Sequence, residues 1–69
     1  MNFEERFEQV IKDRGVPKKE LARKLDIPYS SFLYKAKHLN AWNVPEFQNM
    51  VKTLRLTDEE VVFLATEVN

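Results

Sequence analysis

The feature that most constrains this chain is the spacing of its apolar residues, which recur three and four positions apart along almost its whole length. Two clear sets are Phe3, Phe7, Val10, Ile11 and Phe47, Met50, Val51, Leu54. A repeat close to 3.6 residues places the members of each set on one face of an α-helix. The spacing therefore predicts amphipathic helices that bury these faces in a shared core.

The ends of the helices are marked by capping signals, by the one glycine and by two of the three prolines. The spacing of a capping box occurs in three pairs: Asn2 and Glu5, Asn43 and Glu46, Thr57 and Glu60. Gly15 suits the left-handed residue that ends a first helix. Pro17 and Pro28 predict the starts of a second and a third helix. Together with the helices after Asn43 and Thr57, the pattern predicts an all-α fold of five helices.

The connections between these helices are short. Asp26 and Ile27 form a tight connection, we expect the third helix to run from Tyr29 to Lys37, and residues 38–42 are predicted to be a loop. The β-branched pair Val61 and Val62 also admits a strand near the C-terminus. The preceding cap and three acidic residues in the first turn favour a helix there, because the helix dipole stabilises negative charge at its N-terminus.

The chain has 69 residues and no cysteine, so we expect one domain, residues 1–69, without disulfides. A domain of this size buries only about 60% of the surface of its unfolded chain, and its core is therefore thin. A single histidine, His38, without thiols predicts no metal site, and we expect no cofactor or small-molecule ligand. The carboxylates lie mostly at helix starts, where capping explains them, so an enzyme is not expected. No apolar run reaches the roughly 20 residues that span a bilayer, and the N-terminus lacks a signal-peptide layout.

The formal net charge is zero, but the charge is unevenly distributed along the chain. Residues 17–38 carry six basic and two acidic side chains, whereas residues 1–16 have a net charge of −1 and residues 39–69 one of −3. A polyanion responds to such a local patch over a Debye length of about 8–10 Å. Two interpretations remain open: a nucleic-acid contact, or solvated helix faces that merely differ in charge.

Residues 17–37 have the residue types that a helix-turn-helix needs. Ala22 is small where the helix after Pro28 crosses the helix after Pro17. Ile27 and Phe32 are apolar where the helix after Pro28 is fixed to the core. The segment KKELARKLDIPYSSFLYKAK resembles the helix-turn-helix of the lambda-repressor and Cro family, and small phage Cro-type regulators in particular. The resemblance covers essentially the whole chain and implies a five-helix, lambda-repressor-like DNA-binding domain.

The chain departs from the family pattern at several positions. Asp26 stands where members usually have glycine with a positive φ, and Asp tolerates that conformation better than most residues. Pro28 replaces the usual Ser or Thr cap, and Lys18 the usual Gln near the start of the first helix of the unit. Lys35 replaces an apolar residue, which predicts either a slightly rotated helix or an inner face that uses Ala36.

By this resemblance, the helix from Tyr29 enters the major groove and the preceding helix lies across the DNA backbone. The residues that it implies for base contacts are Tyr29, Ser30, Leu33 and Tyr34. The residues that it implies for phosphate contacts are Lys18, Lys19, Arg23, Ser31, Lys35, Lys37, His38 and Asn40. Alternatives stay open: one tyrosine lies half-buried in the core, Ser31 is a satisfied polar residue, and each lysine is a solvated charge. Trp42 and Met50 are expected in the core.

The resemblance also implies a function and an assembly. We expect a cytoplasmic transcriptional regulator, of a bacterium or a phage-infected host, that occludes an operator in double-stranded DNA. Such operators are commonly palindromic, so a homodimer is expected at least on DNA. Val62, Phe63 and Thr66 lie off the inner stripe of the last helix and are the candidate dimer contacts. The alternatives are an antirepressor or inhibitor that uses the fold to bind protein, and the N-terminal domain of a longer repressor.

Overall fold

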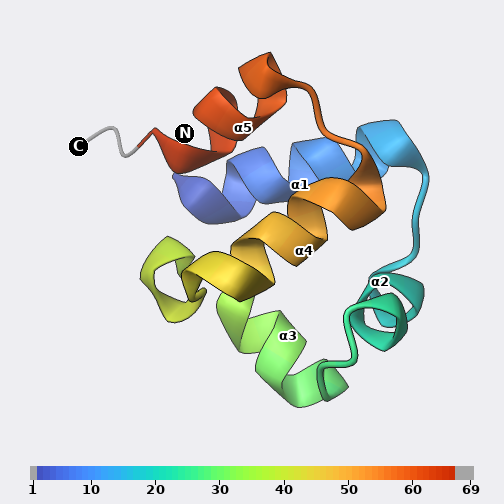
Figure 1. Ribbon diagram of the computed structural model, residues 1–69. Helices are drawn as coiled ribbons and strands as arrows, with labels where there is room; N and C mark the ends of the chain where they lie inside the picture. Colours follow the sequence, from blue (N-terminus) through green and yellow to red (C-terminus); the bar gives the residue numbers. More distant parts are fainter. Residues whose placement is uncertain (1, 67–69) are drawn as a thin grey trace.

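The computed structural model describes residues 2–66, which form five α-helices and one turn of 3₁₀-helix (Figure 1). The elements are α1 (Phe3–Arg14), α2 (Lys18–Lys24), α3 (Tyr29–Lys35), η1 (Leu39–Ala41), α4 (Val44–Leu54) and α5 (Asp58–Ala65). No strand occurs within these residues. The all-α fold is therefore confirmed, and the strand alternative for the last segment is wrong.

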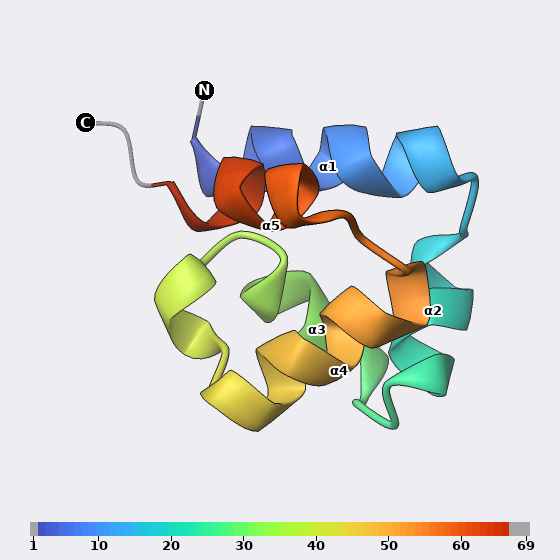
Figure 2. The same cartoon turned by 45° about the horizontal axis from the view of Figure 1, so that its top comes forward.

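The helices are arranged in two levels around one core. In both views α1 and α5 lie side by side and run in opposite directions, on one side of α2, α3 and α4 (Figures 1 and 2). The Phe7 side chain is fully buried between the two levels. Its ring centroid lies 5.4 Å from that of Phe3, 6.1 Å from that of Phe32 and 5.8 Å from that of Trp42. The predicted inner faces of α1 and α3 thus meet Trp42, which follows η1, in an aromatic cluster.

The capping predictions hold at α1, α4 and α5. In all three helices the side chain of the N-cap residue accepts a hydrogen bond from the third helical N–H, and the Glu at that position accepts one from the N-cap N–H. These reciprocal bonds satisfy backbone donors that a helix start otherwise leaves without partners. Gly15 ends α1 in the left-handed conformation, with a φ of 66°.

Several predicted boundaries are wrong by one or two residues. Pro17 and Pro28 have ψ values of 143° and 142°, so each is an extended N-cap and the helix begins at the next residue. α3 ends at Lys35 rather than Lys37, because the chain tightens after it: the Lys37 N–H bonds to the Tyr34 carbonyl, three residues back. Within the predicted loop, residues 39–41 form the 3₁₀ turn.

Arg6 is a buried residue that the apolar pattern alone did not single out. It is 4% exposed, and its guanidinium group donates to the main-chain carbonyl of Thr66. The contact joins α1 to the end of α5. The position of Arg6 is a usable signal, since it lies three residues after Phe3 and four before Val10, within the apolar stripe of α1.

Candidate nucleic-acid interface

The turn between α2 and α3 is fixed by backbone geometry and by the core. Asp26 has a φ of 58°, the left-handed conformation that Asp was expected to tolerate there. The Ile27 N–H then donates to the carbonyl of Ala22 over 3.0 Å. Ala22 and Phe32 are buried, and Ile27 packs against the core. The residues that predicted the helix-turn-helix therefore hold α3 against α2.

The outer face of α3 carries the side chains that were predicted to contact bases. Tyr29, Ser30, Leu33 and Tyr34 are all exposed, whereas Phe32 and Ala36 are buried. Among the three large side chains of this face Tyr34 is the most exposed, at 62%. Spacings of four residues join Tyr29 to Leu33 and Ser30 to Tyr34, so the side chains share one helix face. This face therefore presents two tyrosine rings, three hydroxyl groups and one leucine side chain.

Basic groups flank this face at both ends. The Lys19 ammonium of α2 lies 5.7 Å from the centre of the Tyr29 ring, a cation–π distance. At the other end, the His38 ring is 4.6 Å from the Tyr34 ring. Lys37, His38 and Asn40 line one shallow depression beside Asn2 at the start of α1. The structure thus brings together the three predicted phosphate contacts that follow α3.

Three other predicted phosphate contacts already have partners within the chain. Lys18 pairs with Glu8 of α1, and Arg23 pairs with Glu20 one turn earlier in α2. The hydrogen bond from Arg23 lowers the pKa of the Glu20 carboxyl and raises the pKa of Arg23 itself. The Lys35 ammonium lies 2.9 Å from a carboxylate oxygen of Glu46. A phosphate must compete with these carboxylates.

Lys24 is a basic residue that was not among the predicted phosphate contacts. Lys24 is the last residue of α2, and its side chain is exposed. The side chains of Lys19 and Lys37 are exposed too. Within residues 2–66 none of these three lysines has a carboxylate within ion-pair distance. The signal for Lys24 was present in the run KKELARK, where it follows Arg23 directly. The positive charge without a carboxylate partner on α2 and in the segment after α3 therefore comes from Lys19, Lys24 and Lys37.

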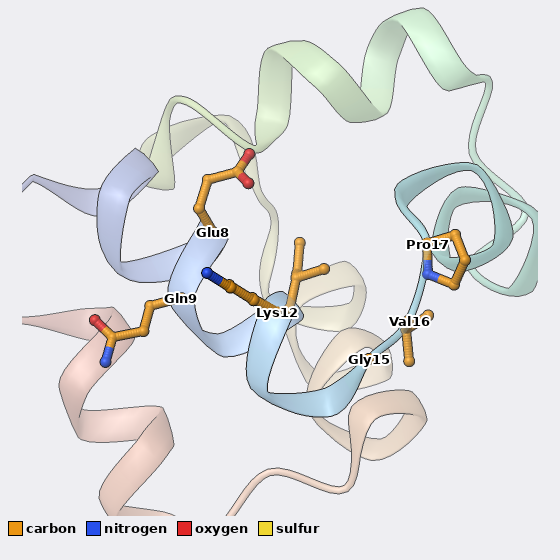
Figure 3. Close-up of a pocket in the computed structure, with 7 residues that line it drawn as sticks. Glu8, Gln9, Lys12, Gly15, Val16 and Pro17 are labelled. Atoms are coloured by element: carbon orange, nitrogen blue, oxygen red, sulfur yellow. The ribbon is translucent and has the colours of Figure 1, made fainter.

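A separate depression lies where α1 leads into α2 (Figure 3). Glu8, Gln9 and Lys12 project from α1 beside it, and the connecting segment contributes Val16 and Pro17. The Lys12 side chain extends back along the helix toward Glu8 and Gln9. The three polar side chains are exposed, and the hollow is shallow. It is not part of the α3 face.

The candidate dimer contacts on α5 differ in their surroundings. Val62 is 63% exposed, whereas Phe63 is 37% exposed and lines a depression with Gln9 and Val10 of α1. Thr66 is the extended C-cap residue of α5, and its hydroxyl donates to the Val62 carbonyl of that helix. Val62 is therefore the most open apolar side chain of the three candidates.

Comparisons with known proteins give no relative. A scan against protein-family models, a search of curated proteins and a search of solved structures each found no match to this chain. In the part of the chain that the structure describes, no helix is both long enough and apolar enough to cross a bilayer. The same residues contain no group of three or more His, Cys, Asp or Glu side chains placed to hold a metal ion.

Proposed function

We propose that this protein is a sequence-specific DNA-binding regulator of the lambda-repressor and Cro type. The observation that carries the proposal is the outer face of α3, where Tyr29, Ser30, Leu33 and Tyr34 are exposed directly after a tight turn from α2. A helix held in this way presents its side chains to the major groove, while the helix before it lies across the backbone. The regulator acts in the cytoplasm by covering an operator and excluding other proteins from it.

The chemistry of each side chain determines whether it contacts phosphates or bases in the proposed complex. Lys19, Lys24 and Lys37 supply positive charge for phosphate contacts, which set affinity and orientation. Tyrosine rings and Leu33 pack on thymine methyl groups, and hydroxyl groups bond to base edges or phosphates. The exposed face of α3 has no Asn, Gln or Arg for bidentate base pairing, so DNA shape and deformability contribute to the choice of site.

The direct test is binding to duplex DNA at several salt concentrations. A duplex selected by the protein from a random-sequence pool is compared with an unselected duplex by fluorescence anisotropy. We expect tighter binding to the selected duplex and an affinity that falls steeply with salt, by a slope of about 0.9 per phosphate contact. Replacing Lys19 and Lys37 with Ala should reduce the slope by about one for each of the two lysines. Lys12→Ala, at an exposed lysine of α1, is the matched control.

A second function is favoured by one observation. The exposed apolar and aromatic side chains of α3 stand on a protein of zero net charge, which also suits a contact with another protein. In that case the protein is an antirepressor or inhibitor that uses the fold without binding DNA. Absence of salt-dependent binding to any duplex would favour this function over the first.

A further inference from the structure

The strongest unassigned feature is a cluster of interactions around Lys35, at the end of α3. The Lys35 ammonium donates to the main-chain carbonyl of Ala41 over 2.8 Å and to the Glu46 carboxylate over 2.9 Å. The Lys35 side chain is only 17% exposed. Its ammonium also lies 6.0 Å from the centre of the Trp42 ring. A lysine with these contacts is directed into the junction of α3, η1 and α4.

The same junction uses the backbone of Lys35. The Trp42 indole N–H donates to the Lys35 carbonyl over 2.8 Å, in the last turn of α3. Trp42 is buried, with its ring against Phe7, Phe32 and Phe47. One residue is thus tied to the core through its carbonyl and to α4 through its side chain.

Glu46 closes the cluster from the side of α4. Its carboxylate accepts a hydrogen bond from the Lys35 ammonium and, in the capping box, another from the backbone N–H of Asn43. These bonds, the one from Lys35 first, lower the pKa of the Glu46 carboxyl, so it is ionised at neutral pH. The charge that caps α4 therefore also holds the end of α3.

We propose that Lys35 is a positioning residue, which sets the orientation of α3 through Glu46 and Trp42, rather than a phosphate contact. Here α3 has only seven residues and no side-chain cap at its start, so its placement depends on tertiary contacts. The Lys35 cluster fixes its C-terminal end, while the turn at Asp26 fixes the other. The consequence for DNA recognition rests on the proposed function.

Two substitutions separate the alternatives. Lys35→Met keeps the length of the side chain and removes the ammonium, and Glu46→Gln removes the carboxylate charge but keeps a capping-box acceptor. Lys12→Met, at an exposed lysine of α1 that has no ion pair among the described residues, is the control for loss of an ammonium group. Glu5→Gln is the control for a capping box without a lysine partner, because among the described residues Glu5 bonds only within the matching box of α1.

The first measurement is the NMR signal of the indole N–H, which is unambiguous because Trp42 is the only tryptophan. We expect this signal to shift in both Lys35→Met and Glu46→Gln, but not in either control. The second measurement is binding to the selected duplex. A positioning role predicts that each substitution weakens this binding by about tenfold, a change of about 1.4 kcal/mol. The salt slope stays unchanged, and the double variant is no weaker than the single ones.

A phosphate contact predicts the opposite pattern. Lys35→Met would then reduce the salt slope by about one, and Glu46→Gln would strengthen binding because it frees the ammonium group. That result, or an unchanged indole signal in both variants, would overturn the positioning role. If the unaltered protein bound no duplex at all, the proposed function and the effect of Lys35 on recognition would both fall. Binding by the unaltered protein with no effect of either variant would refute the positioning role alone.

Discussion

At the scale of single residues, a few side chains do more than their type suggests. Asp26 adopts a left-handed backbone that most non-glycine residues avoid, and it makes the turn before α3 possible. Arg6 uses a charged group inside the core to join α1 to the end of α5. By contrast Tyr34 is an aromatic residue that contributes little to the core, because most of its surface remains exposed.

Tyr34→Ala is therefore expected to affect recognition more than folding. On the selected duplex the loss of its ring and hydroxyl should cost about 1–3 kcal/mol of binding free energy, with a smaller loss on random DNA. The melting temperature should change little, because the side chain is 62% exposed. Anisotropy titrations on both duplexes and a thermal melt measure these effects, with the exposed Gln9→Ala of α1 as control. Equal losses on the two duplexes would show that Tyr34 does not read sequence.

At the scale of elements, the helices fall into two kinds. α1, α4 and α5 each begin with a complete capping box, whereas α2 and α3 begin at prolines that provide no side-chain cap. The two uncapped helices have seven residues each, too few to be stable in isolation. They depend on Leu21, Ala22 and Phe32, which anchor them to the core. The capped helices thus provide the frame for the uncapped pair.

Asn43→Ala should show how much one helix cap contributes to the free energy of unfolding. It removes the side-chain oxygen that accepts the Glu46 N–H over 2.8 Å, so we expect a loss of about 1 kcal/mol of unfolding free energy. For a domain of this size that loss lowers the melting temperature by about 4–8 °C. Asn49→Ala, at an exposed position inside the same helix, should cause no loss because Ala favours helices. Equal melting temperatures for the two variants in denaturation experiments would contradict this role of Asn43.

At the scale of the whole molecule, ion pairs connect helices that are distant in sequence. Arg14 of α1 pairs with Glu60 of α5, and Lys35 of α3 pairs with Glu46 of α4. Both carboxylates also belong to capping boxes. The Thr57 backbone N–H, together with Arg14, lowers the pKa of Glu60, as Lys35 and Asn43 do for Glu46. Protonation of these two carboxylates at low pH therefore weakens the helix caps and the ion pairs between helices at the same time.

The unfolding free energy should fall as the pH drops below the usual glutamate pKa of 4.5. Because the folded pKa values of Glu46 and Glu60 lie below that value, their stabilisation is complete above it and is lost as the carboxylates become protonated. Urea denaturation at a series of pH values measures the change. The double variant Glu46→Gln with Glu60→Gln should have a flatter profile. An equally steep fall in the double variant would assign the acid sensitivity to other groups.

The assembly of the molecule is predicted to depend on α5. Phe63→Ala should shift the protein toward monomer and abolish cooperative binding to a palindromic duplex, while contacts to one half-site survive. Loss of an aromatic anchor at the centre of an interface costs about 2–4 kcal/mol, enough to dissociate a weak dimer. Sedimentation over a concentration series, beside a thermal melt, measures both effects. Val44→Ala, at an exposed apolar residue of α4, is the control.

The surroundings of Phe63 define the competing outcome. The side chain lines a depression with Gln9 and Val10 of α1, so part of its role is within the domain. If that role dominates, Phe63→Ala should melt much earlier and leave the association of subunits unchanged. A well-folded variant with unchanged sedimentation and cooperativity would exclude this face of α5 as the dimer contact.

Local signals in the sequence were sufficient to predict the helices and most of the core. The apolar spacing of α1 and α4 and the three capping boxes depend on residues three or four apart, so they are readable along the chain. The exposed positions Tyr29, Ser30, Leu33 and Tyr34 were predicted by the resemblance of the turn and its anchors. The prolines were less informative, because either one suits an N-cap or the first helical position.

Apart from Arg23 and Glu20, which lie three residues apart in α2, only the tertiary structure decided which of the predicted phosphate contacts have carboxylate partners. Lys18 and Glu8, or Lys35 and Glu46, are 10 and 11 residues apart, so no local pattern pairs them. The contact between Lys19 and Tyr29 likewise exists because the turn brings α2 against α3. Sequence determined which residues are basic, but an ion pair depends on the distance between side chains after folding. In the folded chain Lys19, Lys24 and Lys37 have no carboxylate partner among the described residues. Lys35, by contrast, lies within ion-pair distance of Glu46 in α4.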